Sequence, residues 1–287
     1  MTVIWNDTVA IGDCLNTFGT MAALINVVEK PVNVYFTNQQ VGALFPYEKY
    51  GALAINELPS EWGALIKVSL HDWILKRGEW AGYNVSGGHM AFIEALMTRY
   101  GYQYVPGHFD TTITFPSDDT VPTYDFVIAP YKLNNAHENM TPEFWQSLVD
   151  ALRTKYPSAS LCVIGTDIVP RDEDLAKIEG NIDKFKNPSY LRYNFSRYLT
   201  GVDYFWNEPL TRVAQLMANV RKCFISADSG PSWVWTYLRS DKYHIELFHN
   251  WVLSRGRAEK DGVVPRFYTP THIIIEEVLT AIEKALD

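Results

Sequence analysis

Residues 222–239 read KCFISADSGPSWVWTYLR, and the pattern of this stretch predicts a strand, a tight turn and a helix. Residues 223–226 are apolar enough for a buried strand, while Asp228, Ser229 and Pro231 are typical of the start of a helix. The unpaired N–H groups and the dipole at such a start favour a phosphate or a carboxylate, and Gly230 lets a ligand approach the backbone. An ordinary strand-to-helix turn with a good cap explains the same short motif.

The same alternation extends over the whole chain. Strands are predicted at 2–5, 32–36, 52–55, 64–69, 125–130, 160–164, 223–226 and 243–248, and helices at 14–29, 87–100, 141–155, 209–220, 232–239 and 270–286. Such alternation is typical of parallel sheets covered by helices. Residues 109–124 are rich in Thr, Asp and Pro without a helical period. We therefore predict an α/β protein with domains 1–122 and 123–287, the last helix being a candidate to pack back on the first domain.

Composition limits the classes of partner. The chain has 287 residues and a net charge of −8, which argues against a broad nucleic-acid surface but leaves room for a small basic pocket. Its three cysteines, Cys14, Cys162 and Cys223, have no metal-binding spacing and are typical of small buried residues in a reducing compartment. The chain begins without a signal-peptide pattern and has no apolar run of membrane-spanning length. A cytoplasmic protein without a metal centre is expected.

The loops that follow the predicted strands carry the first candidate residues. Open parallel sheets bind ligands at the carboxyl ends of their strands. Gly12 and Asp13, Lys132, Gly165 and Asp228 all follow strands in this prediction, and two facing domains would place them around one cleft. Asp13 is expected in a loop at a helix start, where its ionised form is stabilised and can accept a proton from a hydroxyl. A helix cap is the alternative role for Asp13.

The other candidates are single polar residues that each have a plain structural alternative. Lys132 could contact a phosphate or be a solvated loop lysine. Arg192, which lies among aromatics, could neutralise a diphosphate or form a surface ion pair. Thr166, next to Gly165, could contact a base or ribose, and His89 could contact an acceptor or be structural. Glu246 lies inside a predicted strand, where it would face a ribose or sugar hydroxyl or sit at an exposed strand end.

Several enzyme classes are excluded by missing motifs. The chain has no GxxxxGK[ST] loop for phosphoryl transfer and no GxGxxG after its first strand. It also lacks the GxSxG of α/β-hydrolases, the HExxH of zinc proteases and any Cys/His cluster.

Taken together, four segments resemble glycosyltransferase family 9, which includes the ADP-heptose:lipopolysaccharide heptosyltransferases and has the GT-B fold. Residues 3–13, VIWNDTVAIGD, are similar to the opening strand and Gly-Asp loop of that family. Residues 126–165 resemble the first β-α-β of its donor domain, and 270–286 resemble its closing helix. Residues 210–231, which end in SADSGP, resemble its helix, strand and Asp-Ser-Gly-Pro signature.

The resemblance implies two Rossmann-like domains that face each other across a cleft, with the donor bound by the second. It implies Asp13 as the catalytic base, backbone N–H groups of Ser229 and Gly230 on the donor diphosphate, Asp228 at the turn or a donor hydroxyl, and Gly165 beside the nucleotide. The implied reaction is direct displacement with inversion. A nucleotide-diphosphate sugar is the co-substrate, and no metal or other cofactor is implied.

Two departures from the family pattern keep the substrate open. Trp233 stands where the family commonly has a histidine, and Glu138 falls near the position of a donor-binding lysine, for which Lys132 is the candidate substitute. The acceptor is a glycan, a lipid-linked sugar or a modified base in DNA. A sugar-nucleotide epimerase and a non-catalytic nucleotide-sugar binder of the same fold are the remaining alternatives.

Overall fold

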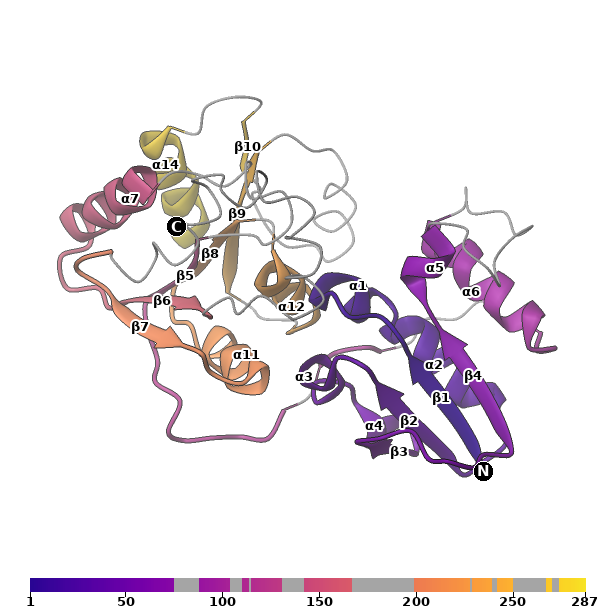
Figure 1. Ribbon diagram of the computed structural model, residues 1–287. Coiled ribbons are helices and arrows are strands. Elements are labelled where there is room, and N and C mark those ends of the chain that lie inside the picture. Colours follow the sequence, from indigo (N-terminus) through magenta and orange to yellow (C-terminus); the bar gives the residue numbers. More distant parts are fainter. Residues whose placement is uncertain are drawn as a thin grey trace, which may run out of the picture. The chain divides into compact units, whose positions relative to one another are not determined.

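The computed structural model describes residues 1–74, 88–103, 110–113, 115–130, 142–166, 199–227, 229–238, 242–249, 267–269 and 274–287. The chain divides into two compact units, Met1–Pro116 and Ser117–Asp287. Each unit contains one parallel sheet with helices packed on it (Figure 1). The division falls inside the stretch rich in Thr, Asp and Pro, close to the predicted boundary at residue 122.

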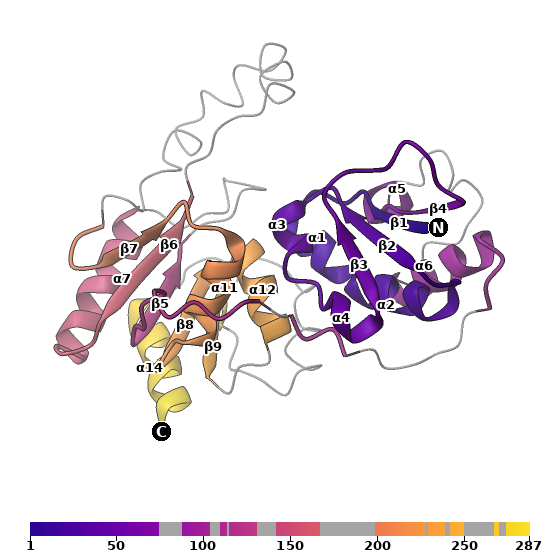
Figure 2. The ribbon, with the colours of Figure 1, turned by 90° about the horizontal axis from the view of Figure 1, so that it is seen from below.

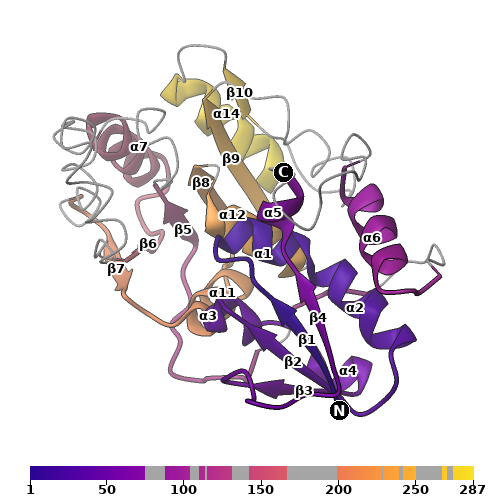
Figure 3. The same ribbon diagram turned by 45° about the vertical axis from the view of Figure 1, so that its right-hand side comes forward.

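The N-terminal unit has a four-stranded parallel sheet in the order β3-β2-β1-β4 (Figure 3). Its strands are β1 (Thr2–Asn6), β2 (Val32–Phe36), β3 (Ala52–Ile55) and β4 (Ala64–Val68). Its helices are α1 (Ile11–Asn16), α2 (Phe18–Val27), α3 (Gln39–Gly42), α4 (Tyr47–Tyr50), α5 (Leu70–Ile74) and α6 (Gly88–Arg99). Strands β2 and β3 lie on one side of β1, and β4 lies on the other side. The loop after β1 is therefore at the point where the strand order reverses.

The predicted helix 14–29 is in fact two helices, α1 and α2, that meet at Thr17. The Thr17 hydroxyl donates to the Cys14 carbonyl at 2.6 Å and accepts from the Asn6 side chain at 2.5 Å. Asn6 is fully buried at the end of β1, and its side-chain oxygen also accepts the Thr8 N–H at 2.9 Å. A buried amide that is satisfied on both sides therefore fixes the turn between β1 and α1.

The C-terminal unit has a six-stranded parallel sheet in the order β10-β9-β8-β5-β6-β7. Its strands are β5 (Phe126–Ala129), β6 (Leu161–Gly165), β7 (Asp203–Trp206), β8 (Cys223–Ala227), β9 (Tyr243–His249) and β10 (Phe267–Thr269). The short strands β7 and β10 were not predicted. From β5 the chain adds β6 and β7 on one side and β8, β9 and β10 on the other, so the order reverses between β5 and β8.

Helices cover both faces of this sheet (Figure 2). One face packs on α7 (Pro142–Lys155) and α14 (Ile275–Leu286), with Trp145, Leu148, Val278 and Ile282 in the core. The other side carries α11 (Leu210–Ala218) and α12 (Gly230–Leu238). The final helix thus begins at Ile275 rather than 270, and it packs in the core of the C-terminal unit.

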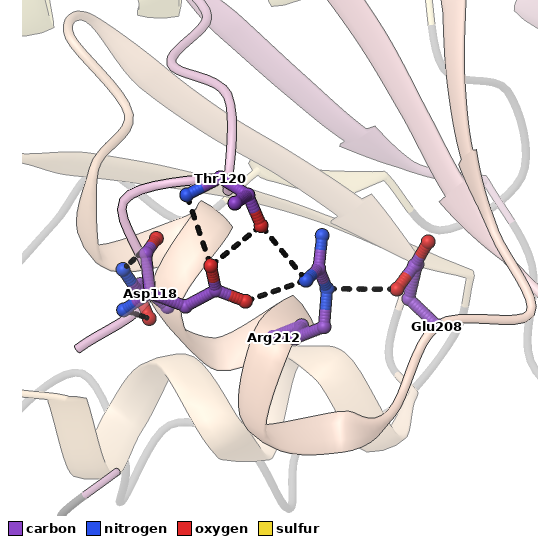
Figure 4. Close-up of polar contacts among 5 residues, drawn as sticks. Asp118, Thr120, Glu208 and Arg212 are labelled. Carbon is purple, nitrogen blue, oxygen red and sulfur yellow. Dashed lines mark hydrogen bonds and ion pairs between the residues drawn. The ribbon is translucent and has the colours of Figure 1, made fainter. Parts of the chain in front are cut away.

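A polar network attaches the first residues of the C-terminal unit to α11 (Figure 4). Arg212 contacts the Asp118 carboxylate at 2.5 Å, the Thr120 hydroxyl at 3.0 Å and Glu208 at 2.8 Å. Gln215 exchanges two bonds with the Asp118 backbone, at 2.9 and 2.8 Å. Hydrogen bonds from Thr120, followed by the charge of Arg212, lower the pKa of Asp118. These contacts explain why the unit begins before Asp118.

At the amino-terminal edge of the same sheet, the side chain of Asp125 holds three strands together through hydrogen bonds. Asp125 accepts bonds from Arg221 at 2.9 Å and from the Ser160 N–H and hydroxyl at 2.8 and 3.0 Å, which joins the starts of β5, β6 and β8. The Arg221 hydrogen bond is the main reason that the pKa of Asp125 is lowered to about 2.

Because the folded-state pKa of Asp125 is depressed, its stabilisation is present above pH ~4 and is lost as pH falls toward 2. We expect the unfolding free energy of the wild type to fall by roughly 1 kcal/mol more than that of Asp125→Asn over this window, after allowance for solvent screening. Urea denaturation at several pH values measures both curves. Parallel curves would contradict the assignment.

Candidate functional site

The turn after β8 is closed by a reciprocal cap between Ser229 and Ser232. Helix α12 begins at Gly230, earlier than the predicted start at Ser232. The Ser229 carbonyl accepts the Ser232 N–H at 3.0 Å and the Ser232 hydroxyl at 2.8 Å. In return, the Ser229 N–H donates to Ser232 Oγ at 3.2 Å. The Ser232 side chain thus caps the Ser229 N–H as in one half of a capping box, whereas the Ser229 side chain does not accept the Ser232 N–H.

The cap changes which groups of the turn are open to a ligand. The Ser229 N–H donates to Ser232 Oγ within the cap, and its contact with a phosphate stays a prediction. Pro231 has no N–H, whereas the N–H of Gly230 is the first of the helix and has no acceptor inside α12. Ser229 Oγ is buried and forms no hydrogen bond with any residue that the structure describes. Among the described residues of this turn, the Gly230 N–H and the Ser229 hydroxyl are therefore the donors without a hydrogen bond inside the turn.

Beside the turn, β8 and β9 present three buried polar side chains. Ser226, His244 and Glu246 are only 0%, 3% and 1% exposed. Ser226 lies opposite Glu246 in the register of the two strands, and Ser226 Oγ is 2.8 Å from His244 Nε2. Glu246 is therefore not at an exposed strand end, which had been the alternative interpretation. Burial of a carboxylate is costly unless a polar group contacts it. Glu246, opposite Ser226 near the carboxyl end of β8, is therefore a candidate to bind a polar group.

Gly165 and Thr166 lie at the carboxyl end of β6, on the same edge of the sheet. Gly165 pairs with Trp206 of β7, and a Cβ on Gly165 would lie 2.2 Å from the Trp206 ring. The Thr166 hydroxyl donates to Asn207 Oδ1 at 2.9 Å, and Asn207 has a positive φ of 59°. The missing side chain of Gly165 thus makes room for Trp206. Neither Trp206 nor Asn207 was proposed from the sequence, because strand β7 was not recognised.

Gly165→Ala should destabilise the C-terminal unit. The added methyl group would displace the Trp206 ring, and overpacking of this kind costs about 1–3 kcal/mol. Chemical denaturation of both proteins measures the difference. Gly19→Ala is the matched control, because a Cβ on Gly19 in α2 meets no atom within 4 Å. A Gly165→Ala variant as stable as the wild type would contradict the Trp206 contact.

Asp13 lies in the N-terminal unit, in the first turn of α1 rather than in a loop. The helix begins at Ile11, so Gly12 is also helical, and the Asp13 side chain is exposed. Burial, reinforced by the Asp13 carboxylate, raises the pKa of the Cys14 thiol. Cys14 is thus a neutral core residue, and Asp13 is the ionisable group that α1 presents to solvent.

The structure does not place every candidate. Ser229, Gly230, Glu246, Gly165 and Thr166 lie at the carboxyl edge of one sheet, whereas Gly12 and Asp13 follow β1 of the other. Lys132, Asp228 and Arg192 lie outside the described residues. His89 belongs to α6, but its side chain is outside the described part.

Two further properties concern the described residues alone. They include no group of three or more His, Cys, Asp or Glu side chains arranged to hold a metal ion. No helix among them has both the length and the apolar character needed to cross a membrane.

Comparison with known proteins gives structural matches only. No family model and no curated protein matches the sequence. The E. coli heptosyltransferase WaaC with ADP matches with a TM-score of 0.60 and 13% identity, over 99% of this chain and 97% of that one. A glycosyl transferase family 9 protein from Veillonella parvula matches with a TM-score of 0.57 and 11% identity, over 99% and 97% of the two chains. The dodecameric, iron-containing glycosyltransferase TibC from enterotoxigenic E. coli matches with a TM-score of 0.53 and 14% identity, over 95% of this chain and 61% of that one.

These matches cover both units and confirm the predicted fold class of two Rossmann-like α/β domains. At 11–14% identity they establish the fold and not the activity. The chain has the fold of the heptosyltransferases and of a family 9 glycosyltransferase, as the SADSGP segment indicated.

Proposed function

We propose that the protein is a glycosyltransferase that moves a sugar from a nucleotide-diphosphate sugar to an acceptor hydroxyl. The observation that carries the proposal is the β8–α12 turn. It lies where the strand order of the sheet reverses, next to the buried Glu246, in a chain with the fold of heptosyltransferases. Ligands of open parallel sheets bind at such reversal points.

The C-terminal unit is proposed to bind the donor. The start of α12 would hold the diphosphate through the Gly230 N–H, the Ser229 hydroxyl and the helix dipole. Glu246 would accept a hydrogen bond from a hydroxyl of the ribose or sugar. Thr166, beside Gly165, lies on the same edge and is proposed for the nucleoside side of the donor. Lys132, Arg192 and Asp228 remain proposed donor contacts from the sequence.

The N-terminal unit is proposed to bind the acceptor and supply the base. Asp13 would take the proton of the acceptor hydroxyl while the hydroxyl oxygen bonds to the anomeric carbon. The bond from that carbon to the diphosphate oxygen breaks on the opposite side, so the configuration inverts and the nucleoside diphosphate leaves. Donors at the start of α12 would stabilise its growing negative charge. His89 is proposed as an acceptor contact and Gly12 as a donor contact.

The reaction is proposed to need no metal ion, because the helix start and nearby cations would neutralise the leaving group. A structural neighbour described as iron-containing makes a chelator control necessary. The three cysteines are free and buried, which supports a reducing compartment such as the cytoplasm.

The epimerase alternative would need acid and base groups around the donor. His244 is 3% exposed and bonded to Ser226, so this histidine is held within the sheet rather than offered to a sugar. A transferase acting on DNA bases is disfavoured by the net charge of −8. These observations favour a glycan or a lipid-linked sugar as the acceptor.

Calorimetry and thermal shift against ADP, other nucleoside diphosphates and their sugar conjugates test the proposal, with and without chelator. ADP comes first because a structural neighbour contains it. A ligand at 100 times its Kd should stabilise the fold by about 2.7 kcal/mol. Metal-independent binding, followed by release of the nucleoside diphosphate and formation of the glycosylated acceptor, would support the transferase. Binding without turnover would indicate a non-catalytic binder, and no binding across the panel would overturn the proposal.

A further inference from the structure

Helix α12 is joined to the sheet by three stacked rings. The Trp235 ring stacks on Phe224 of β8 at 5.2 Å with an interplanar angle of 19°. The His244 ring from β9 stacks on Phe224 at 4.9 Å and meets Trp235 at 5.7 Å. Trp235 is 4% exposed and lies in the helix that starts at Gly230. These rings therefore pack α12 against β8 and β9.

The orientation of the His244 ring is fixed by a hydrogen bond with Ser226. Its Nε2 atom lies 2.8 Å from Ser226 Oγ, and both residues are almost completely buried. A phenylalanine at position 244 would stack equally well, and it would avoid the cost of burying the imidazole of His244 and the hydroxyl of Ser226. A buried polar pair adds little net stability, but it restricts the ring to one orientation.

We propose that Ser226 and His244 are positioning residues for the phosphate-binding turn, an inference that rests on the proposed function. Ser226 is in the strand that leads into the turn, and His244 holds Trp235 of the helix that leaves it. The pair thus contacts the strand before the turn and the helix after it. Without the hydrogen bond the ring at position 244 should be able to turn within the stack, which should shift α12 and move the Gly230 N–H away from the diphosphate.

The double variant Ser226→Ala/His244→Phe separates positioning from stability. It removes both polar partners and keeps the aromatic stack, so the melting temperature should stay within about 3 °C of the wild type. The Kd for ADP, or for the best nucleoside diphosphate of the panel, should rise about tenfold. His244→Gln tests the ring itself. Its amide can bond Ser226 but removes the ring that meets Trp235, so it should melt lower than the double variant and should also raise the Kd for ADP.

Ser160→Ala is the matched control, because it removes a serine hydroxyl that bonds Asp125 at the opposite edge of the same sheet. It should lower the melting temperature and leave the Kd for ADP unchanged. A folded double variant that binds ADP like the wild type would overturn the inference alone. A wild type that binds no nucleoside diphosphate would overturn the proposed function and this inference with it. Equal losses of affinity in the double variant and Ser160→Ala would also overturn it, since they would reflect general destabilisation.

Discussion

Asp13→Asn should lower the kcat of sugar transfer by about 10²–10⁴-fold, while the Kd for ADP stays within about twofold of the wild type. The amide keeps the size of the side chain but cannot accept the acceptor proton. Asp13 is exposed in the first turn of α1, so the substitution should not disturb the core. Initial-rate kinetics and calorimetry with ADP give the two numbers separately.

Asp7→Asn is the matched control for Asp13. Asp7 follows the same strand, but it forms an ion pair with Lys67 at 2.8 Å. Its loss should change kcat little, because its carboxylate is paired with Lys67, and a partly exposed ion pair contributes only about 1 kcal/mol to stability. Full activity in Asp13→Asn would remove Asp13 as the base. Equal losses in both variants would point to a general effect on the loop after β1.

Gly230→Val should raise the Kd for ADP about 10–100-fold, which corresponds to the loss of one hydrogen bond to a charged group. The branched side chain would stand at the first position of α12, beside the N–H proposed to meet the diphosphate. Gly230→Ala should give a smaller increase, because a methyl group covers less of that N–H. Calorimetry with ADP measures both variants, and circular dichroism confirms that they fold.

Gly19→Ala tests whether the effect of Gly230→Val is local. Gly19 is also a helical glycine, but it lies in α2 of the other unit, and a Cβ there meets no neighbour within 4 Å. ADP affinity should not change. A folded Gly230→Val protein with wild-type affinity would remove the phosphate site from this turn.

The sequence by itself determined the class of fold and the strand-turn-helix that the proposal depends on. Apolar runs such as CFISA and the helix-start residues after them act locally, so β8 and α12 were predicted close to their observed bounds. Glu246 was singled out because a charge inside a strand is unusual, and its burial confirms that position. Strands β7 and β10 were not predicted, because such short strands depend on pairing with neighbours that are distant in the sequence.

Only the tertiary structure decided which groups of the turn are open. The bond from the Ser229 N–H to Ser232 depends on where α12 begins, and helix starts are poorly fixed by local sequence. Likewise, Gly165 has no side chain because the Trp206 ring fills that space, and the His244 ring is held by Ser226 and Phe224. These contacts join different strands, and the sequence does not show which strands are neighbours. The order of the six strands, which places the β8–α12 turn at the reversal point, also arises from long-range pairing. Local pattern thus specified the elements, while packing between distant segments specified the site.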